Sequence, residues 1–363
     1  MKKDDLTILL MLKDRIAFTK RWLDYMAYVK FPFKIYIADG SIDDQAKDYL
    51  ETNKKRFECL DINYVRYPYD ANFSVYYKKI ADALDKIKTK YTAVSDNDDF
   101  YVVDGLDKSI DFMNSHDDYS SCRGEISAIA VYSKTNDPDL KFLYGRSGSI
   151  TYKYYTGESV ENERSSDRVM QHAFCYFPTF YDVHRTGHLK MCFEALRDIN
   201  PENLYLAEYI TSYLTAAAGK IKRLPCLYYV RQLNAPGSSN AAESEKYDFF
   251  DRMMLPSWSH DFNGAAEAVS KIISDKDGIA ADEAKTIFMK AYKKHVAANI
   301  IWSVKRKDIV KPSFGAKVMK KYSNIKTRIF KSLFWMNVSN IRKTNRKYYA
   351  SIKPIVDFLS GVK

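Results

Sequence analysis

Apolar positions along the first hundred residues come in short runs separated by longer, mixed segments. Four runs are each typical of a buried strand: residues 7–12, 34–38, 60–66 and 91–95. Three segments between them are typical of helices: residues 16–29, the stretch that ends at residue 50, and residues 73–88. Strands that alternate with helices in this way predict right-handed βαβ units, and therefore an α/β fold with a mostly parallel sheet flanked by helices.

The pattern changes after residue 120, where tyrosine, serine and threonine become frequent. The later elements are expected at these positions: β-like runs at 128–133, 150–155 and 177–184, helices at 188–197 and 203–217, and a strand at 224–232. Residues 234–240 combine Asn, Pro, Gly and Ser, which is the composition of a loop. We therefore divide the chain into a first domain at 1–235, a helical extension at 236–305 and a basic C-terminal region at 306–363.

Positive charge is concentrated in the C-terminal region. The chain of 363 residues has a formal net charge of +11, yet residues 301–363 alone hold sixteen Lys or Arg and two acidic residues. The first 300 residues therefore carry a net charge of about −3. The five cysteines are scattered and never in CxxC spacing, which fits reduced thiols in a cytoplasm and argues against a zinc site. The N-terminus is expected to be a first strand rather than a signal peptide, and no apolar run reaches the ~18 residues of a membrane span.

An acidic motif, Asp96-Asn97-Asp98-Asp99, directly follows the fourth predicted strand. Three carboxylates this close repel one another, and a cation between them would relieve the repulsion. An Asp-x-Asp pair at a strand end is a half-site for Mg²⁺ or Mn²⁺, which prefer oxygen ligands and keep positions open for water and phosphates. The alternative is an acidic turn in which Asp98 or Asp99 caps the helix that begins near Asp104.

Asp39 follows the second predicted strand and precedes Gly40-Ser41. In open parallel sheets, ligands bind at the carboxyl ends of the strands. Asp39 and the acidic motif are therefore expected at the same edge of the sheet, close enough to bind one ligand. Taken alone, an aspartate before glycine is also typical of a simple turn.

Eight segments between residues 5 and 235, about two thirds of the chain, carry a family resemblance: Thr7–Arg15, Arg21–Tyr25, Ile37–Ser41, Lys78–Tyr91, Ser95–Phe100, Phe180–Thr186, Leu206–Tyr209 and Leu227–Arg231. In this order they resemble GT-A-fold nucleotide-sugar glycosyltransferases of the family-2 kind, and most of all a bacterial subgroup associated with surface polysaccharide clusters. The resemblance implies a GT-A-like (Rossmann-like) domain at 1–235 that binds the nucleotide sugar and carries out catalysis.

The resemblance also implies roles for individual residues. Asp39 would face the base or ribose of the donor. Asp98 would bind Mg²⁺ or Mn²⁺ directly, with Asp96 beside it as a second ligand, nearer the ribose or a bound water. Glu208 stands where inverting members carry the acid that accepts the proton of the acceptor hydroxyl.

This sequence departs from the family pattern in two places. Where the family usually has Thr-x-Asn-Arg after the first strand, this sequence has Met11-Leu12-Lys13-Asp14-Arg15. The histidine that binds the metal late in the sequence of some relatives has no clear counterpart after Arg231.

The chemistry of sugar transfer suggests further binding residues. The departing diphosphate develops negative charge, which a metal or a guanidinium group would stabilise. Arg231 follows a predicted strand and could bind the phosphates with two hydrogen bonds, and Arg185 is a second candidate. Alternatives remain for each residue: Glu208 could be a solvated position on its helix, and the two arginines could form surface charges or structural ion pairs.

The basic region contains an apolar stripe within 312–339 whose residues recur at intervals of three and four, surrounded by Lys and Arg. Such a helix is typical of the surface of an anionic membrane. The alternative is a helix packed on the protein core with a solvated basic face. A nucleic-acid partner is disfavoured, because the first 300 residues are slightly acidic and no nucleic-acid motif accompanies the basic region.

The sequence thus predicts a cytoplasmic enzyme, peripheral at the inner face of the cell membrane. It would transfer a sugar from a nucleotide-sugar donor, with UDP as the expected nucleotide, to a glycan or lipid-linked glycan of a bacterial surface polymer such as capsule or O-antigen. Two other functions stay open. A metal-dependent nucleotidyltransferase uses a similar sheet but usually brings a Gly-rich N-terminal loop, and a catalytically degenerate scaffold of polysaccharide assembly would keep the fold without the chemistry.

Overall fold

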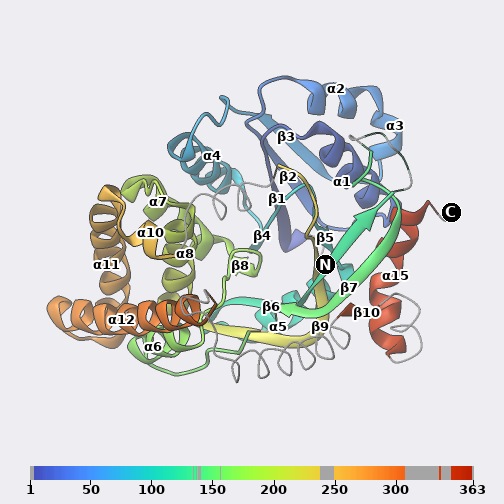
Figure 1. Ribbon diagram of the computed structural model, residues 1–363. Helices are drawn as coiled ribbons and strands as arrows, with labels where there is room; N and C mark the ends of the chain where they lie inside the picture. The colour runs from blue at the N-terminus through green and yellow to red at the C-terminus, as the bar shows by residue number, and fades with distance from the viewer. Residues whose placement is uncertain are drawn as a thin grey trace.

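A twisted mixed sheet runs through the middle of the molecule in this computed structural model, which describes residues 4–133, 135, 137, 140–155, 157–237, 249–306, 335–336 and 345–361. Its first half is formed by four parallel strands: β1 (Leu6–Leu12), β2 (Lys34–Asp39), β3 (Ile62–Arg66) and β4 (Tyr91–Ser95). The four predicted strands of this half are confirmed to within two residues at each end. Their shared direction places every carboxyl end at one edge of the sheet, as the alternation of strands and helices predicts (Figure 1).

The second half of the sheet mixes directions. Its strands are β5 (Phe100–Tyr101), β6 (Tyr119–Tyr132), β7 (Arg146–Tyr155), β8 (Val183–Arg185), β9 (Lys220–Gln232) and β10 (Trp335–Met336). Among the described residues the strand order is β10-β7-β6-β8-β4-β1-β2-β3, with β9 paired to β5 and β6. Strand β8 runs antiparallel to β4, whereas β6 and β9 are parallel to each other. The predicted α/β fold is confirmed, and this half gives the sheet its mixed character.

Two hydrophobic cores form on opposite faces of the sheet, because successive side chains of a strand point to opposite sides. In β1, Ile8 and Leu10 enter the first core, while Leu9 and Met11 enter the second. The first core is covered by α1 (Ile16–Tyr28), α2 (Gln45–Thr52), α3 (Lys54–Phe57), α5 (Val103–Ser115) and α15 (Arg346–Ser360). The second is covered by α4 (Phe73–Lys86), α6 (Ser165–Phe174), α7 (Thr186–Ile199), α8 (Leu204–Ala218), α10 (Phe249–Met253), α11 (Pro256–Asp277) and α12 (Ala281–Arg306).

The helical extension packs directly on the first domain. Val269 of α11 and Phe288 of α12 lie in the same core as Ile80 of α4 and Ile210 of α8. Figure 1 shows α11 and α12 stacked against α6, α7 and α8 on one side of the molecule. Part of the expected boundary loop, residues 238–240, lies outside the described residues.

Helix α15 returns to the first domain and packs against β7, β9 and α1 (Figure 1). Its apolar face, which includes Tyr348, Ile352, Ile355 and Leu359, is buried in the first core. This part of the basic C-terminal region is therefore a helix packed on the core. Most of the apolar stripe predicted within 312–339 lies outside the described residues, except that Trp335 and Met336 form β10 against β7. None of the helices in the described ranges combines the length and apolar character that a membrane crossing needs.

Candidate functional site

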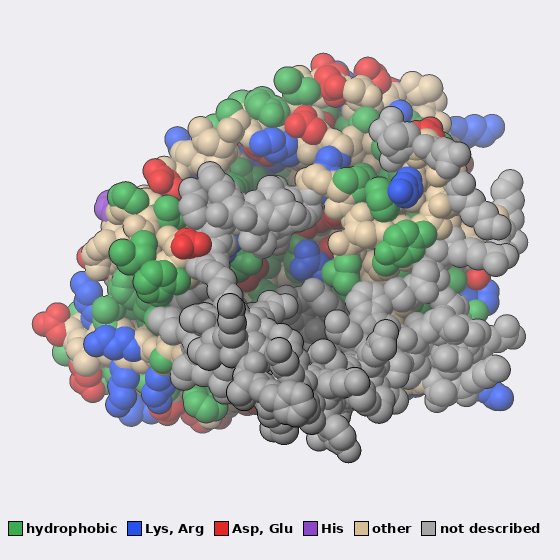
Figure 2. Space-filling view, in the orientation of Figure 1, with side chains coloured by type: hydrophobic (Ala, Val, Ile, Leu, Met, Phe, Trp, Pro, Cys, Tyr) green, Lys and Arg blue, Asp and Glu red, His purple; other side chains and the backbone are tan. Residues whose placement is uncertain are grey.

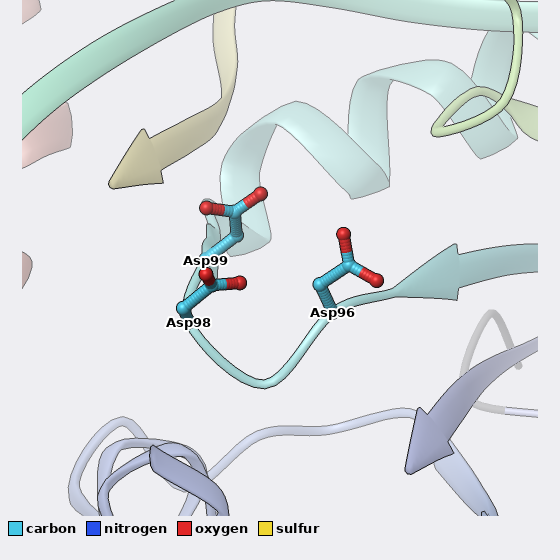
Figure 3. A group of neighbouring side chains, drawn as sticks. All are labelled: Asp96, Asp98 and Asp99. Atoms are coloured by element: carbon cyan, nitrogen blue, oxygen red, sulfur yellow. The ribbon is translucent and has the colours of Figure 1, made fainter. Parts of the chain in front are cut away.

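The acidic motif lies on the loop between β4 and β5, at the carboxyl edge of the parallel strands. Asp96, Asp98 and Asp99 each bring a carboxylate oxygen within 4.8 Å of the other two. Figure 3 shows the three side chains on this one loop, with their carboxylates gathered around a common space. Helix α5 has Val102 as its N-cap and no side-chain cap. The alternative in which Asp98 or Asp99 caps this helix is therefore wrong, and the carboxylates are used elsewhere.

Each carboxylate of the motif accepts a hydrogen bond from a different element. The hydroxyl of Tyr181 donates to Asp96, and Arg15 Nη2 donates to Asp98 Oδ2 at 2.9 Å. Asp99 Oδ1 accepts the backbone N–H of Gln232 at 2.8 Å, and its Oδ2 lies 3.3 Å from Arg231 Nε. The loop is thus tied to the end of β9 and to the loop after β1.

Three guanidinium groups offset the charge of the three carboxylates. Besides Arg15 and Arg231, the fully buried Arg21 donates from Nη2 to the backbone carbonyl of Asp98 at 2.8 Å. Burial lowers the pKa of Arg21 to about 10, so the group remains charged at neutral pH. A cluster of this kind carries strong local fields that favour a charged ligand.

Burial and mutual repulsion perturb the acidic motif. Burial, followed by the charge of Asp98, raises the pKa of Asp99 to about 8. The same two causes raise the pKa of Asp96. Carboxylates that are hard to ionise together are the expected result of crowding three of them in one buried loop.

The three carboxylates fit a hard divalent cation. All their donor atoms are oxygens, and each carboxylate group retains lone pairs beyond the protein hydrogen bonds described above. A cation among oxygens that lie within 4.8 Å of one another would replace repulsion by attraction. Asp98 and Asp96 would hold such an ion as the sequence predicts, with Asp99 as a third ligand that sequence reasoning did not include.

The loop after β1 joins the acidic motif to the Asp39 turn. Asp14 and Arg15 both have positive φ, at 55° and 56°, which is an uncommon backbone conformation for residues other than glycine. While Arg15 reaches Asp98, Asp14 Oδ1 accepts the N–H of Ile42, and Ser41 Oγ accepts the N–H of Asp14. One short loop therefore contacts both predicted parts of the site.

Asp39 lies at the same edge of the sheet as the acidic motif, as predicted. It pairs with Leu12 at the end of β1, on the side of β1 opposite to β4. With one strand between them, β2 and β4 are roughly 10 Å apart. Asp39 is fully buried; its Oδ1 accepts the N–H of Ser41 at 2.9 Å and its Oδ2 accepts the hydroxyl of Tyr64 at 2.7 Å. Its contact with a nucleoside stays a prediction.

The buried ion pair between Lys79 and Asp70, which the sequence analysis missed, packs against the turn that follows Asp39. Lys79 of α4 binds the carboxylate of Asp70 and donates to the carbonyl of Leu12 at 2.9 Å. A Cβ at Gly40 would lie 2.6 Å from the carboxylate carbon of Asp70, so glycine is needed for this close approach. The i+9 spacing of Asp70 and Lys79 across a loop gave no signal in the sequence.

Glu208 lies half-buried on α8 and is electrostatically linked to the acidic motif through Arg231. Burial raises the pKa of Glu208, and the charge of Arg231, followed by a hydrogen bond from Tyr176, opposes the shift. Tyr176 donates its hydroxyl to Glu208 Oε1 at 3.3 Å. Oε2 has no hydrogen-bond partner among the described residues. A carboxylate with a raised pKa and a free oxygen is suited to accept a proton.

The structure does not bring Arg185 to this site. Arg185 pairs with Tyr91 at the start of β4, whereas Asp96 follows the end of that strand, roughly 16 Å away at the rise of a β-strand. Its guanidinium group donates to the carbonyls of Tyr119, at 2.8 Å, and His116, also at 2.8 Å. The prediction that Arg185 binds the donor is therefore corrected: the residue ties β8 to the end of α5, because β8 runs antiparallel to β4.

The face of the molecule shown in Figure 2 is hollowed near its centre. Both acidic and basic side chains are visible in the depth of this hollow, between the region of α4 above and the stacked helices at the left. Such a concave, charged region is where a polar ligand gains the most from fixed charges.

Comparisons with known proteins gave structural matches alone. No family model matches the chain, and no curated protein matches it. It is similar to the crystal structure of S. aureus TarS at 12% identity and a TM-score of 0.43, covering 80% of this chain and 54% of that chain, about half its length. It is also similar to TarS 1–349 in complex with UDP, at 13% identity and a TM-score of 0.46. The match to TarS 1–349 in complex with UDP-GlcNAc has 12% identity and a TM-score of 0.44. Each of these two matches covers 82% of this chain and 92% of that chain.

Proposed function

We propose that this protein is a glycosyltransferase that moves a sugar from a nucleotide-sugar donor to a hydroxyl group of a glycan acceptor. One observation carries the proposal: Asp96, Asp98 and Asp99 converge at the carboxyl edge of a parallel sheet, with arginines from two other elements and with Asp39 one strand away. This edge is where α/β sheets bind nucleotides.

In the proposed donor complex, Asp39 and Asp96 hold the nucleoside, and Asp98 with Asp96 holds Mg²⁺ or Mn²⁺. The ion would supply electrostatic stabilisation of the departing diphosphate. Arg231 and Arg15 are already placed within the acidic cluster and would turn toward phosphate oxygens, which accept charge-assisted hydrogen bonds from guanidinium groups. These positions support a nucleotide-sugar donor without selecting its base; UDP stays the expected nucleotide.

Glu208 is the proposed general base for the acceptor hydroxyl. The group is half-buried, its pKa is raised by burial, and one of its oxygens has no partner among the described residues. As the hydroxyl oxygen attacks the anomeric carbon, its proton would pass to Glu208, and the anomeric bond to the diphosphate would break.

The proposed acceptor is a bacterial surface glycan or its lipid-linked precursor, reached by an enzyme that lies on the inner face of the cell membrane. The excess of Lys and Arg after residue 300 supports this part of the proposal. Because the apolar face of α15 is buried in the protein, membrane contact is assigned to the basic residues between 307 and 344. Replacing Lys317, Lys320 and Lys321 by Gln should reduce sedimentation with anionic vesicles.

A thermal-shift panel of UDP-, GDP-, CMP- and dTDP-sugars, with and without Mn²⁺, tests the proposed function. The panel includes UDP-GlcNAc, with which TarS was crystallised. We expect one donor class to raise the melting temperature, more with Mn²⁺ than with EDTA, and Asp98→Asn to lose the metal-dependent part. Lack of any shift with all four classes, in a folded protein, would favour the scaffold alternative.

A further inference from the structure

Aromatic side chains from three elements pack together beside Glu208. Tyr176, which follows α6, lies edge-on to Tyr209 of α8, with ring centroids 4.8 Å apart. Its hydroxyl is the group that donates to Glu208 Oε1 at 3.3 Å. The ring is thus held by packing, and the hydroxyl is held by the carboxylate.

The third element is α12 of the helical extension. His295 of this helix is buried and lies edge-on to both Tyr176 and Tyr209, with centroids 4.7 Å apart in each case. Asn299, one turn later, has its Nδ2 3.1 Å from His295 Nε2. Burial lowers the pKa of His295 to about 4, so the ring is neutral at physiological pH and packs as an aromatic group.

The charged and titratable groups that face Glu208 come from two neighbouring elements. They are Arg231 on β9 and the phenol of Tyr176, which follows α6. On α8 itself, the neighbouring titratable group is Tyr209, the residue directly after Glu208. Arg231 also contacts Asp99, so its position is shared with the donor part of the site. The hydroxyl of Tyr176, in contrast, donates a hydrogen bond to Glu208, and no contact between Tyr176 and the acidic motif is seen among the described residues.

We propose that Tyr176 is a positioning residue for Glu208, and that α12 holds it in place through His295. This inference rests on the proposed role of Glu208 as general base. The hydrogen bond fixes Oε1, which leaves Oε2 directed to the acceptor, and it stabilises the ionised carboxylate that a base requires. The helical extension is therefore part of the machinery that activates the acceptor, rather than a separate packing domain.

Tyr176→Phe removes the donated hydrogen bond and keeps the ring. The chain offers a matched control, Tyr213→Phe, because Tyr213 packs in the same aromatic group and its buried hydroxyl has no partner among the described residues. Near-ultraviolet circular dichroism confirms the fold of each variant. The main measurement is an NMR titration of ¹³C-carboxyl-labelled glutamate, with the Glu208 signal assigned by Glu208→Gln.

We expect the pKa of Glu208 to rise by about 0.5–1 unit in Tyr176→Phe and to stay unchanged in Tyr213→Phe. The acidic limb of the pH profile of kcat/KM should shift to higher pH by the same amount. At pH values below the pKa of Glu208, kcat/KM should therefore fall roughly 3- to 10-fold, while on the alkaline plateau it should be retained. An unchanged pKa in Tyr176→Phe, or an equal rise in both variants, overturns the inference. The predicted pKa rise in a protein that transfers no sugar would instead refute the proposed function and leave the contact between Tyr176 and Glu208 established.

Discussion

The buried ion pair between Lys79 and Asp70 gives the sharpest test of how the donor edge is held. Both side chains are almost fully enclosed, with 1% and 3% of their surface exposed. Lys79→Met keeps the length of the side chain and removes its charge, which leaves the Asp70 carboxylate buried without its cation and the Leu12 carbonyl without its donor. Removing one partner of a buried pair costs about 3–5 kcal/mol, so we expect the free energy of unfolding to fall by that amount.

The same helix carries a matched control. Lys86 of α4 pairs with Asp82, and both side chains are 49% exposed. Lys86→Met should cost less than about 1 kcal/mol, because exposed pairs gain little over solvent. Urea denaturation followed by tryptophan fluorescence compares the two variants. Adding Asp70→Asn to Lys79→Met should recover part of the loss, since the double variant no longer buries an unpaired carboxylate.

The loss of unfolding free energy in Lys79→Met, called the deficit below, should depend on pH with a definite sign. Burial raises the pKa of Asp70, and the charge of Lys79 opposes that rise. In Lys79→Met the folded-state pKa rises further above the unfolded value of about 3.9, so stability is lost as pH increases toward the folded-state pKa. The deficit should therefore be larger at pH 7.5 than at pH 5. Equal deficits at both values, or a cost no greater than that of Lys86→Met, would refute the reasoning.

Three further predictions concern the site and the two cores. Asp98→Asn should abolish the Mn²⁺-dependent rise in melting temperature with donor, as EDTA does for the wild type; a variant that still responds to Mn²⁺ would contradict metal binding at Asp98. His172 is buried with its pKa lowered to about 3, so the wild type should lose stability relative to His172→Phe as pH falls below 6.5, by about 1.4 kcal/mol at pH 5.5, and a pH-independent difference would exclude this cause. Ile352→Ala on α15 should cost about 2–5 kcal/mol because the side chain is fully buried, whereas the exposed Lys347→Ala should cost less than about 0.5 kcal/mol; similar urea midpoints would show that α15 is dispensable.

The parallel half of the fold could be predicted because local sequence determines it. The runs at 7–12 and 91–95 are mostly apolar, and they are buried on both faces of the sheet in β1 and β4. The shared edge followed from strand direction alone, since all four strands of a βαβ series end on the same side. For this reason Asp39 and Asp98 could be assigned to the same edge of the sheet from the sequence alone.

The position of Arg185 could not be predicted, because a single sequence does not reveal that β8 is antiparallel to β4. Reversing a strand exchanges its two ends, and the residue moves to the far edge of the sheet. Arg15 and Tyr181 were missed for a different reason. Both lie in segments that carry the family resemblance, but each contacts the acidic motif across more than eighty residues, and the sequence does not show which side chains reach it.

The assembly of this protein during synthesis is constrained by the return of α15 to the first domain. Leu6 at the beginning of β1 and Ile352 near the other end of the chain belong to one core. A nascent chain that has emerged only as far as α12 exposes the apolar surface of β7 and β9 that α15 later covers. Completion of the first core must therefore wait until α15 has been translated, so β7 and β9 are fully enclosed only after this helix has emerged.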